Sequence, residues 1–333
     1  MEAHELSHQW WSISAAFNDV CRAYDTTWVK RRRCANSLAM TFLVLRLCYS
    51  KNSQGYGTMI HDTWKSLQEA FPRLRFQKPM AASSFCEARA KIDERLFKDL
   101  NTAVIQLSST NDDSTTRWLG HRIFSIDASK IILPHELTAW GFKPANEKTH
   151  YPQGLVSTLF NLKTRLPYDV TLKELMSERI PVPQHLDHLS AGDVVVYDRG
   201  YFSYELLWEH SRRGIHAVFR IKGKNNLRRI QTFLERSRLL EEVVTIKPED
   251  RYARTVKHRL DSDVLKSIAL RIIKYRIKDK IYYLATTFLD KDAYTVENLK
   301  ELYHSRWGVG VSRQGHVYLV GESPTAAKRL KAA

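Results

Sequence analysis

Two aspartates lie at short apolar runs that are typical of buried strands. Asp127 ends the run Ile123–Asp127, and Asp198 directly follows Val194–Tyr197. Carboxylate oxygens are the ligands that Mg²⁺ prefers, and a pair of them on rigid strands could hold the ion for phosphoryl transfer on DNA. Each aspartate could instead cap a turn or a following helix. The pair alone leaves both interpretations open.

The surrounding sequence predicts the elements that would position these aspartates. Short apolar runs bounded by turn residues predict strands, and longer amphipathic segments predict helices. Residues Lys163–Arg165 would join the second and third strands into an antiparallel hairpin. The order of elements is that of a mixed α/β domain. The expected strands are Ile123–Asp127, Leu155–Leu162, Tyr168–Leu172, Val194–Tyr197 and His216–Ile221, and the expected helices are Tyr204–Arg213 and Leu299–Trp307.

Residues 1–115 predict an all-helical region before this domain. Apolar residues from Phe17 to Trp28 recur at helical spacing. Ser84 and Glu87 resemble a capping box at the start of one helix whose apolar face runs from Ala88 to Val104. The polar cluster at residues 108–116 is the expected linker to a second domain at 116–309.

The charge balance indicates a polyanionic partner. The chain has 52 Lys and Arg against 36 Asp and Glu, a formal net charge of +16. Most of the excess lies after residue 120, and nucleic acid is the first partner to consider. In a strand at 271–278, alternation would place Lys274, Arg276 and Lys278 on one face. That face could bind DNA or could simply be solvated.

Other classes of protein are disfavoured. The charge-free stretch Cys34–Leu45 is shorter than the roughly 20 apolar residues that cross a bilayer. Glu2 and Glu5 precede the first cation, which is the wrong sign for a secretion signal. The four cysteines form no C-x-x-C pair, so neither a zinc site nor a disulfide framework is predicted. We therefore expect a cytoplasmic protein with reduced thiols and no membrane partner.

Several motifs together resemble the cut-and-paste DDE transposases of the insertion sequence 4 family. The resemblance covers about residues 120–309. It implies an RNase H-like mixed sheet with helices and a strand-rich insertion around 222–290, preceded by helices that bind the transposon ends. The motifs are Ile126–Ser129, Tyr151–Gln153 before Leu155–Leu162, Thr164–Pro167, Asp198–Tyr201 with Glu205–Leu207, and Tyr303-x-x-Arg306-Trp307.

The resemblance also implies roles for single residues. Asp127 and Asp198 would be the first and second ligands of Mg²⁺, with Mn²⁺ as a substitute, and would be catalytic. Tyr303 and Arg306 would contact the phosphates of the transposon end. The partners would be double-stranded DNA, as transposon ends and target, and a second copy of the chain on that DNA in a bacterial cytoplasm, associated with the nucleoid. Basic residues that we add as DNA-binding candidates are Arg199, Lys274, Arg276 and Lys278.

The end of the last motif departs from the family pattern. The family has a Glu four positions after the Arg and a Lys seven positions after that Glu, but here these positions hold Gly310 and Val317. We expect the helix to end near Trp307 or Gly308, and residues 310–333 to be an aberrant tail left by a frameshift or rearrangement. Loss of an anionic ligand would weaken the binding of a second ion and impair cleavage.

Three functions therefore remain open. The first is a metal-dependent transposase that cleaves and joins DNA strands at element ends, impaired in this chain. The second is a catalytically dead remnant that binds DNA ends without chemistry. A third and more distant possibility is a host nuclease of the same fold.

Overall fold

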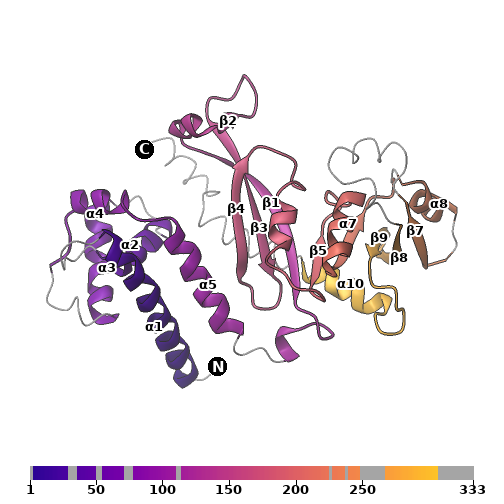
Figure 1. Ribbon diagram of the computed structural model, residues 1–333, viewed down its shortest axis with the longest axis horizontal. Coiled ribbons are helices and arrows are strands. Elements are labelled where there is room, and N and C mark those ends of the chain that lie inside the picture. The colour runs from indigo at the N-terminus through magenta and orange to yellow at the C-terminus, as the bar shows by residue number, and fades with distance from the viewer. Residues whose placement is uncertain are drawn as a thin grey trace. The chain divides into compact units, whose positions relative to one another are not determined.

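The computed structural model of the chain describes residues 3–28, 36–49, 55–70, 78–109, 114–224, 227–236, 239–247 and 267–306. They divide into two compact units, one within Met1–Asn111 and one within Asp112–Ala333 (Figure 1). Position 307 and everything after it lie outside the described residues. The expectations for Gly310, Val317 and the tail at 310–333 therefore have no structural counterpart here.

The first unit is helical in its described part. Its core is built from residues such as Met40, Leu43, Trp64 and Phe85, all nearly inaccessible to solvent. The side chain of Asn36 accepts a hydrogen bond from the Ala39 amide at 2.8 Å and so caps the second helix. The helices are α1 (Ala3–Trp28), α2 (Ser37–Tyr49), α3 (Tyr56–Ala70), α4 (Ala82–Arg89) and α5 (Arg95–Ser109).

The single helix that Ser84 and Glu87 predict is wrong, because the segment forms two helices. The residue before α4 is Ala81, whose side chain caps nothing. After α4 ends at Arg89, the Asp93 carboxylate accepts a hydrogen bond from the Arg95 amide at 2.9 Å. An aspartate in this position satisfies one of the free amides at a helix start, so a new helix begins at Arg95.

The described part of the second unit contains one mixed sheet of nine strands. The strand order is β2-β3-β1-β5-β6-β9-β8-β7, and β4 also pairs with β3. Strands β1, β5 and β6 are parallel to one another, and the other pairings are antiparallel. The strands are β1 (Ile123–Ile132), β2 (Lys143–Pro144), β3 (Pro152–Asn161), β4 (Pro167–Glu174), β5 (Val194–Tyr197), β6 (His216–Ile221), β7 (Glu241–Ile246), β8 (Ile268–Ile277) and β9 (Lys280–Thr286).

The mixed α/β fold class expected from the sequence, with a helical region before it, is confirmed. The hairpin is also confirmed, since β3 and β4 pair antiparallel. Its turn forms because the Asn161 side chain accepts from the amides of Lys163 and Thr164 at 2.9 and 3.0 Å. Within the segment around 222–290, strands β7, β8 and β9 continue the sheet beyond β6.

Helices cover both faces of this sheet. Val195 and Tyr197 of β5 pack toward α7, whereas the alternate residues Val194 and Val196 pack toward α10. Figure 1 shows α7 and α10 on opposite sides of this part of the sheet. The helices of the unit are α6 (Val182–Leu186), α7 (Tyr204–Arg213), α8 (Arg228–Arg236) and α10 (Val296–Ser305), with the 3₁₀ turns η2 (Ser114–Thr116) and η3 (His135–Trp140).

Within the described ranges, every helix is too short or too polar to cross a membrane.

Candidate active site

Asp127 and Asp198 lie at the same level of two neighbouring parallel strands. The last pair in the ladder between β1 and β5 is Ser125 with Val196. Each aspartate lies two residues after that pair, and side chains two residues apart on a strand share a face. Neighbouring strands are about 4.8 Å apart, so the two carboxylates leave the backbone side by side.

The expectation that Asp127 closes its strand is wrong. Strand β1 continues to Ile132 because it pairs antiparallel with β3 on its other side, where Asp127 lies opposite Thr158. The parallel ladder with β5 ends before Asp127, although the strand does not. Asp198 does follow the last residue of β5, as expected. Asp127 therefore lies inside β1, where β3 is its paired neighbour.

Helix α10 and Arg306, the residue that caps its C-terminus, contact both carboxylates. The Tyr303 hydroxyl donates a hydrogen bond to Asp198 Oδ1 at 3.4 Å. Arg306 Nη2 lies 3.5 Å from Asp127 Oδ2. Residues three apart in a helix lie on the same face, so Tyr303 and Arg306 reach the sheet together. Both aspartates therefore face α10, and the structure brings these four expected site residues into one cluster.

The position of this helix follows from its sequence. Thr295 and Asn298 form a reciprocal capping box at its first turn. Leu299, Leu302 and Tyr303 then lie on one stripe and are buried against the sheet. This stripe holds the face with Tyr303 and Arg306 toward the aspartates.

Arg220 is a site residue that the sequence reasoning missed. Strands β5 and β6 are parallel with Val196 opposite Val218, so Arg220 lies at the level of Asp198. Its Nη1 is 4.0 Å from Asp198 Oδ1, and its guanidinium lies 5.1 Å from the centre of the Tyr282 ring. The two strands are predicted from the sequence, but their parallel pairing and register, which define the position of Arg220, come from the fold.

Backbone amides fix the orientation of both carboxylates. The amide of Ala128 donates to Asp127 Oδ1 at 2.9 Å, and the amide of Arg199 donates to Asp198 Oδ1 at 2.8 Å. One oxygen of each carboxylate is thus anchored by the amide of the residue that follows it.

The formal charges of the cluster cancel. Two carboxylates face two guanidinium groups, those of Arg220 and Arg306. Burial and the neighbouring Asp198 raise the pKa of Tyr303, while the two arginines oppose the rise. The Tyr303 phenol is therefore protonated at neutral pH and remains a hydrogen-bond donor. A divalent cation added to this neutral cluster would leave it positive, which suits an anionic phosphate.

The donor set fits a hard cation with few protein ligands. Among the residues that the structure describes, no group of three or more His, Cys, Asp or Glu side chains could hold a metal ion. Mg²⁺ binds through one or two carboxylates and completes its shell with water and substrate phosphates. Asp127 and Asp198 supply such a pair, with side chains 25% and 39% exposed. The pair therefore fits Mg²⁺ or Mn²⁺ bound with water and substrate ligands, and does not fit a metal site closed by protein ligands alone.

Of the other predicted DNA-binding residues, Arg199 adjoins this cluster, whereas Lys274, Arg276 and Lys278 belong to β8 and the turn after it. Arg199 is exposed beside Asp198. Lys274 and Arg276 lie on the sheet face opposite the aspartates, where Lys274 Nζ is 5.6 Å from the ring centre of Phe233 in α8. The expected row of three cations is wrong at Lys278, because β8 ends at Ile277 and Lys278 lies in the turn with a φ of 52°.

The chain is similar to known transposases in sequence and in fold. A family model described as Transposase DDE domain matches residues 118–309, which include all the residues of the cluster. Among solved structures, a cryo-EM structure of the piggyBac transposase synaptic complex with hairpin DNA matches with 12% identity and a TM-score of 0.40. The match covers 92% of this chain and 66% of that chain, so this chain spans slightly less than two thirds of its length. A search of curated proteins gives no match.

Proposed function

The chain belongs to the transposase DDE domain family, and from this premise we propose that it is the DNA transposase of an insertion sequence of the insertion sequence 4 type. Its reaction would be phosphoryl transfer at the ends of the element. The observation that carries the proposal is the placement of Asp127 and Asp198 at one level of parallel strands, with Tyr303 and Arg306 reaching them from one helix.

The residues of the cluster would divide the chemistry between them. Asp127 and Asp198 would hold Mg²⁺ or Mn²⁺, which supplies charge neutralisation at the reacting phosphate. In cleavage, a water oxygen would bond to phosphorus, the bond to the 3′ oxygen would break, and a 3′ hydroxyl would leave. In joining, the oxygen of that 3′ hydroxyl would bond to a target phosphorus, the bond from this phosphorus to the target's own 3′ oxygen would break, and a target 3′ hydroxyl would leave. Arg306 and Arg220 would grip phosphate oxygens, and Tyr303 would donate a hydrogen bond.

The partners would be double-stranded DNA and a second protomer. Transposon ends and target DNA would both be substrates, and we propose a homodimer that holds two ends. The exposed cations Arg276 and Lys278, together with Arg199 and Lys274, would contact the DNA backbone outside the reacting phosphate. A bacterial cytoplasm, with the protein bound to the nucleoid, is the compartment that this function requires.

We also propose that cleavage by this chain is impaired. The motif positions for the third carboxylate and the lysine hold Gly310 and Val317. With two carboxylates in place of three, a second ion would bind weakly and less charge would be neutralised. The alternative function, a DNA-binding remnant without chemistry, rests on the same two positions.

A strand-cleavage assay on the ends of the chain's own element tests these proposals. Labelled duplexes with either the end sequence or a scrambled sequence are incubated with the full chain and Mg²⁺ or Mn²⁺. We expect preferential binding of the end duplex and little or no cleavage. Replacement of residues 310–333 by the matching end of a related full-length element should restore cutting.

Matched variants separate the outcomes. In the repaired chain, Asp127→Asn and Asp198→Asn should abolish cutting, while Asp292→Asn, a change at an exposed carboxylate outside the cluster, should not. Cutting by the original chain that vanishes in Asp127→Asn would overturn the impairment and keep the transposase. End binding with no cutting even after repair would favour the remnant, and equal binding to both duplexes would contradict both functions.

A further inference from the structure

A buried cation lies away from the candidate active site. The side chain of Arg271 in β8 is 1% exposed. Its Nε donates to Glu241 Oε2 at 2.7 Å, and its Nη2 also contacts that oxygen. Its Nη1 donates to the carbonyl oxygens of Tyr294 at 2.6 Å and Asp290 at 3.4 Å. One guanidinium therefore joins β7, through Glu241, to the loop between β9 and α10.

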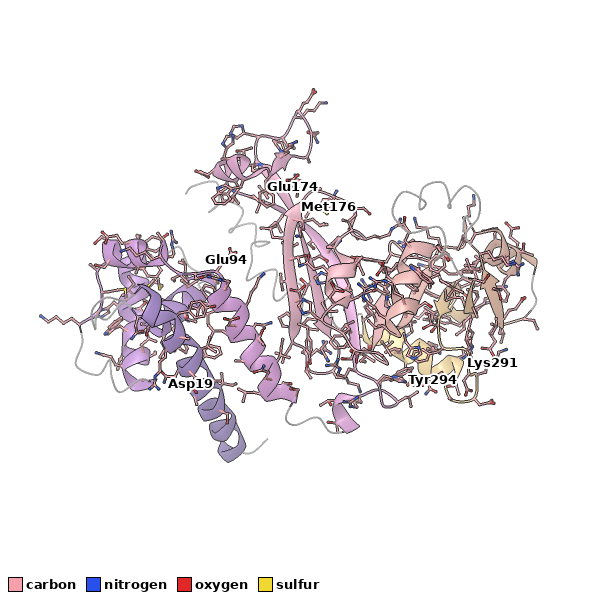
Figure 2. The ribbon with its side chains drawn as sticks, viewed as in Figure 1. Asp19, Glu94, Glu174, Met176, Lys291 and Tyr294 are labelled. Carbon is pink, nitrogen blue, oxygen red and sulfur yellow. The ribbon has the colours of Figure 1, made fainter. Side chains whose placement is uncertain are left out.

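The kind of side chain matters at this position. A buried charge costs free energy unless it is paired and hydrogen-bonded, so a residue that only filled space here would be apolar. Arginine presents a rigid planar fork that fixes several acceptors at once, which lysine does not. Lys291 Nζ adds a second contact from the loop, 3.5 Å from Glu241 Oε1. Figure 2 labels Lys291 and Tyr294, which both lie in this loop.

The same loop is also attached to the strands that carry the aspartates. The Tyr294 hydroxyl lies 2.8 Å from His121 Nε2, and His121 Nδ1 lies 2.6 Å from the Gly192 carbonyl oxygen. Because a carbonyl only accepts, Nδ1 carries the proton and Nε2 accepts from Tyr294 when His121 is neutral. His121 precedes β1 and Gly192 precedes β5. The loop is thus attached to β1 and β5, which carry the two aspartates, and to β7 and β8.

We propose that Arg271 and Glu241 position α10 and thereby set Tyr303 and Arg306 over the two aspartates. This inference rests on the proposed function of that cluster. Tyr294 is followed directly by Thr295, the residue that caps α10. A helix moves as a rigid unit, so displacement of its first turn displaces its last. The contacts of 3.4 and 3.5 Å to the aspartates would be lost after a shift of about 1 Å.

In this role, the strands of the segment around 222–290 would help to arrange the candidate active site. Lys274 and Arg276 lie on the same strand as Arg271 but on the opposite face. DNA bound there would touch the strand whose buried arginine holds the loop before α10. Arg271 acts through the helix and contacts neither aspartate, so its role is one of positioning.

Hydrogen–deuterium exchange of the full chain tests this role without requiring activity. Arg271→Met removes the fork, Glu241→Gln removes its anionic partner with little change of shape, and Arg271→Lys keeps only the charge. We expect exchange in peptides from α10 to rise about tenfold or more in the first two variants, while β1 and β5 stay protected. Arg271→Lys should be intermediate. Glu297→Gln, which removes an exposed ion pair with Lys300 on α10 itself, should leave exchange near the original level.

Two results would overturn the proposal. Faster exchange limited to β7 and β8, with α10 unchanged, would mean that Arg271 and Glu241 stabilise only those two strands. An effect of Glu297→Gln as large as that of Glu241→Gln would mean that α10 responds to any lost ion pair. If Arg271→Met does not fold, Glu241→Gln decides. A chain that binds element ends no better than the scrambled duplex, but shows the expected exchange, overturns the proposed function and leaves the positioning role intact.

Discussion

Asp127 and Asp198 share one level of the sheet, because each follows by two residues the last pair, Ser125 with Val196, in the parallel ladder between β1 and β5. Their settings differ in one respect. Asp127 lies within a strand that continues along β3, whereas Asp198 begins the turn after β5. Asp127 is therefore held by pairing with β3, and Asp198 by a turn whose Tyr201 amide donates to the Asp198 carbonyl at 3.1 Å.

Arg220 should contribute to DNA binding. Its place beside Asp198 and Tyr282 leaves its guanidinium 25% exposed and able to meet a phosphate. We expect Arg220→Gln to weaken binding of the end duplex about tenfold and to reduce the slope of log K against log salt by about one. Fluorescence anisotropy at several salt concentrations measures both quantities. Arg212→Gln, at an arginine paired with Glu209 on α7, is the control, and an unchanged slope in Arg220→Gln contradicts a phosphate contact.

A buried histidine should make the folded state sensitive to acid. His210 Nδ1 donates to the Ile215 carbonyl at 3.2 Å, so its Nε2 accepts from the Tyr197 hydroxyl at 2.8 Å. Burial lowers the pKa of His210 from 6.5 to about 3. Between these values the unfolded chain binds a proton that the folded chain does not, so the free energy of unfolding falls as the pH falls.

The size of this effect can be measured. His210 alone should contribute about 1.4 kcal/mol per pH unit below its unfolded pKa. Urea unfolding at pH values from 7 to 4.5 should show this slope on top of the contributions of other groups. His210→Gln should lower the slope by about 1.4 kcal/mol per pH unit, which corresponds to one proton fewer taken up on unfolding. The same slope in both proteins would show that His210 is protonated in the folded chain.

Thiol reactivity should follow burial in the first unit. Cys21 is 1% exposed, and burial, opposed by a hydrogen bond with Thr41, raises its pKa to about 11. Cys86 is exposed. At pH 8 we expect iodoacetamide to modify Cys86 at least about 100-fold faster than Cys21, because only the thiolate reacts. Peptide mass spectrometry resolves the two sites, and comparable rates would mean that α1 does not pack as described. Cys34 lies outside the described residues.

Elements with clear boundary signals could be predicted from the sequence, while those that depend on distant partners could not. The expected helix Tyr204–Arg213 is α7 residue for residue, because Ser203 caps its start and Gly214 ends it with a φ of 66°. The length of β1 could not be predicted in this way, since it depends on pairing with β3. A local pattern also cannot show where β8 turns back, so the pattern predicts a strand that includes Lys278, whereas β8 ends at Ile277.

The candidate site likewise contains residues that the sequence identifies and residues that only the fold identifies. Motifs identified Asp127, Asp198, Tyr303 and Arg306, and the fold brings these four together. Arg220 carries no motif and is defined only by register between strands. The buried Arg271 reads in the sequence as one more cation in a basic segment, because Glu241 and the loop before α10 approach it only in the folded chain.

The most direct test of the account is whether the two aspartates bind one divalent cation together. Electron paramagnetic resonance measures the concentration of free Mn²⁺ while the full chain is titrated with the ion in the absence of DNA. We predict one weak site that is lost in Asp127→Asn and equally in Asp198→Asn, and that is kept in Asp292→Asn. Mn²⁺ binding that survives in either of the first two variants with unchanged affinity would contradict a shared site, and with it the assignment of this cluster as the catalytic centre.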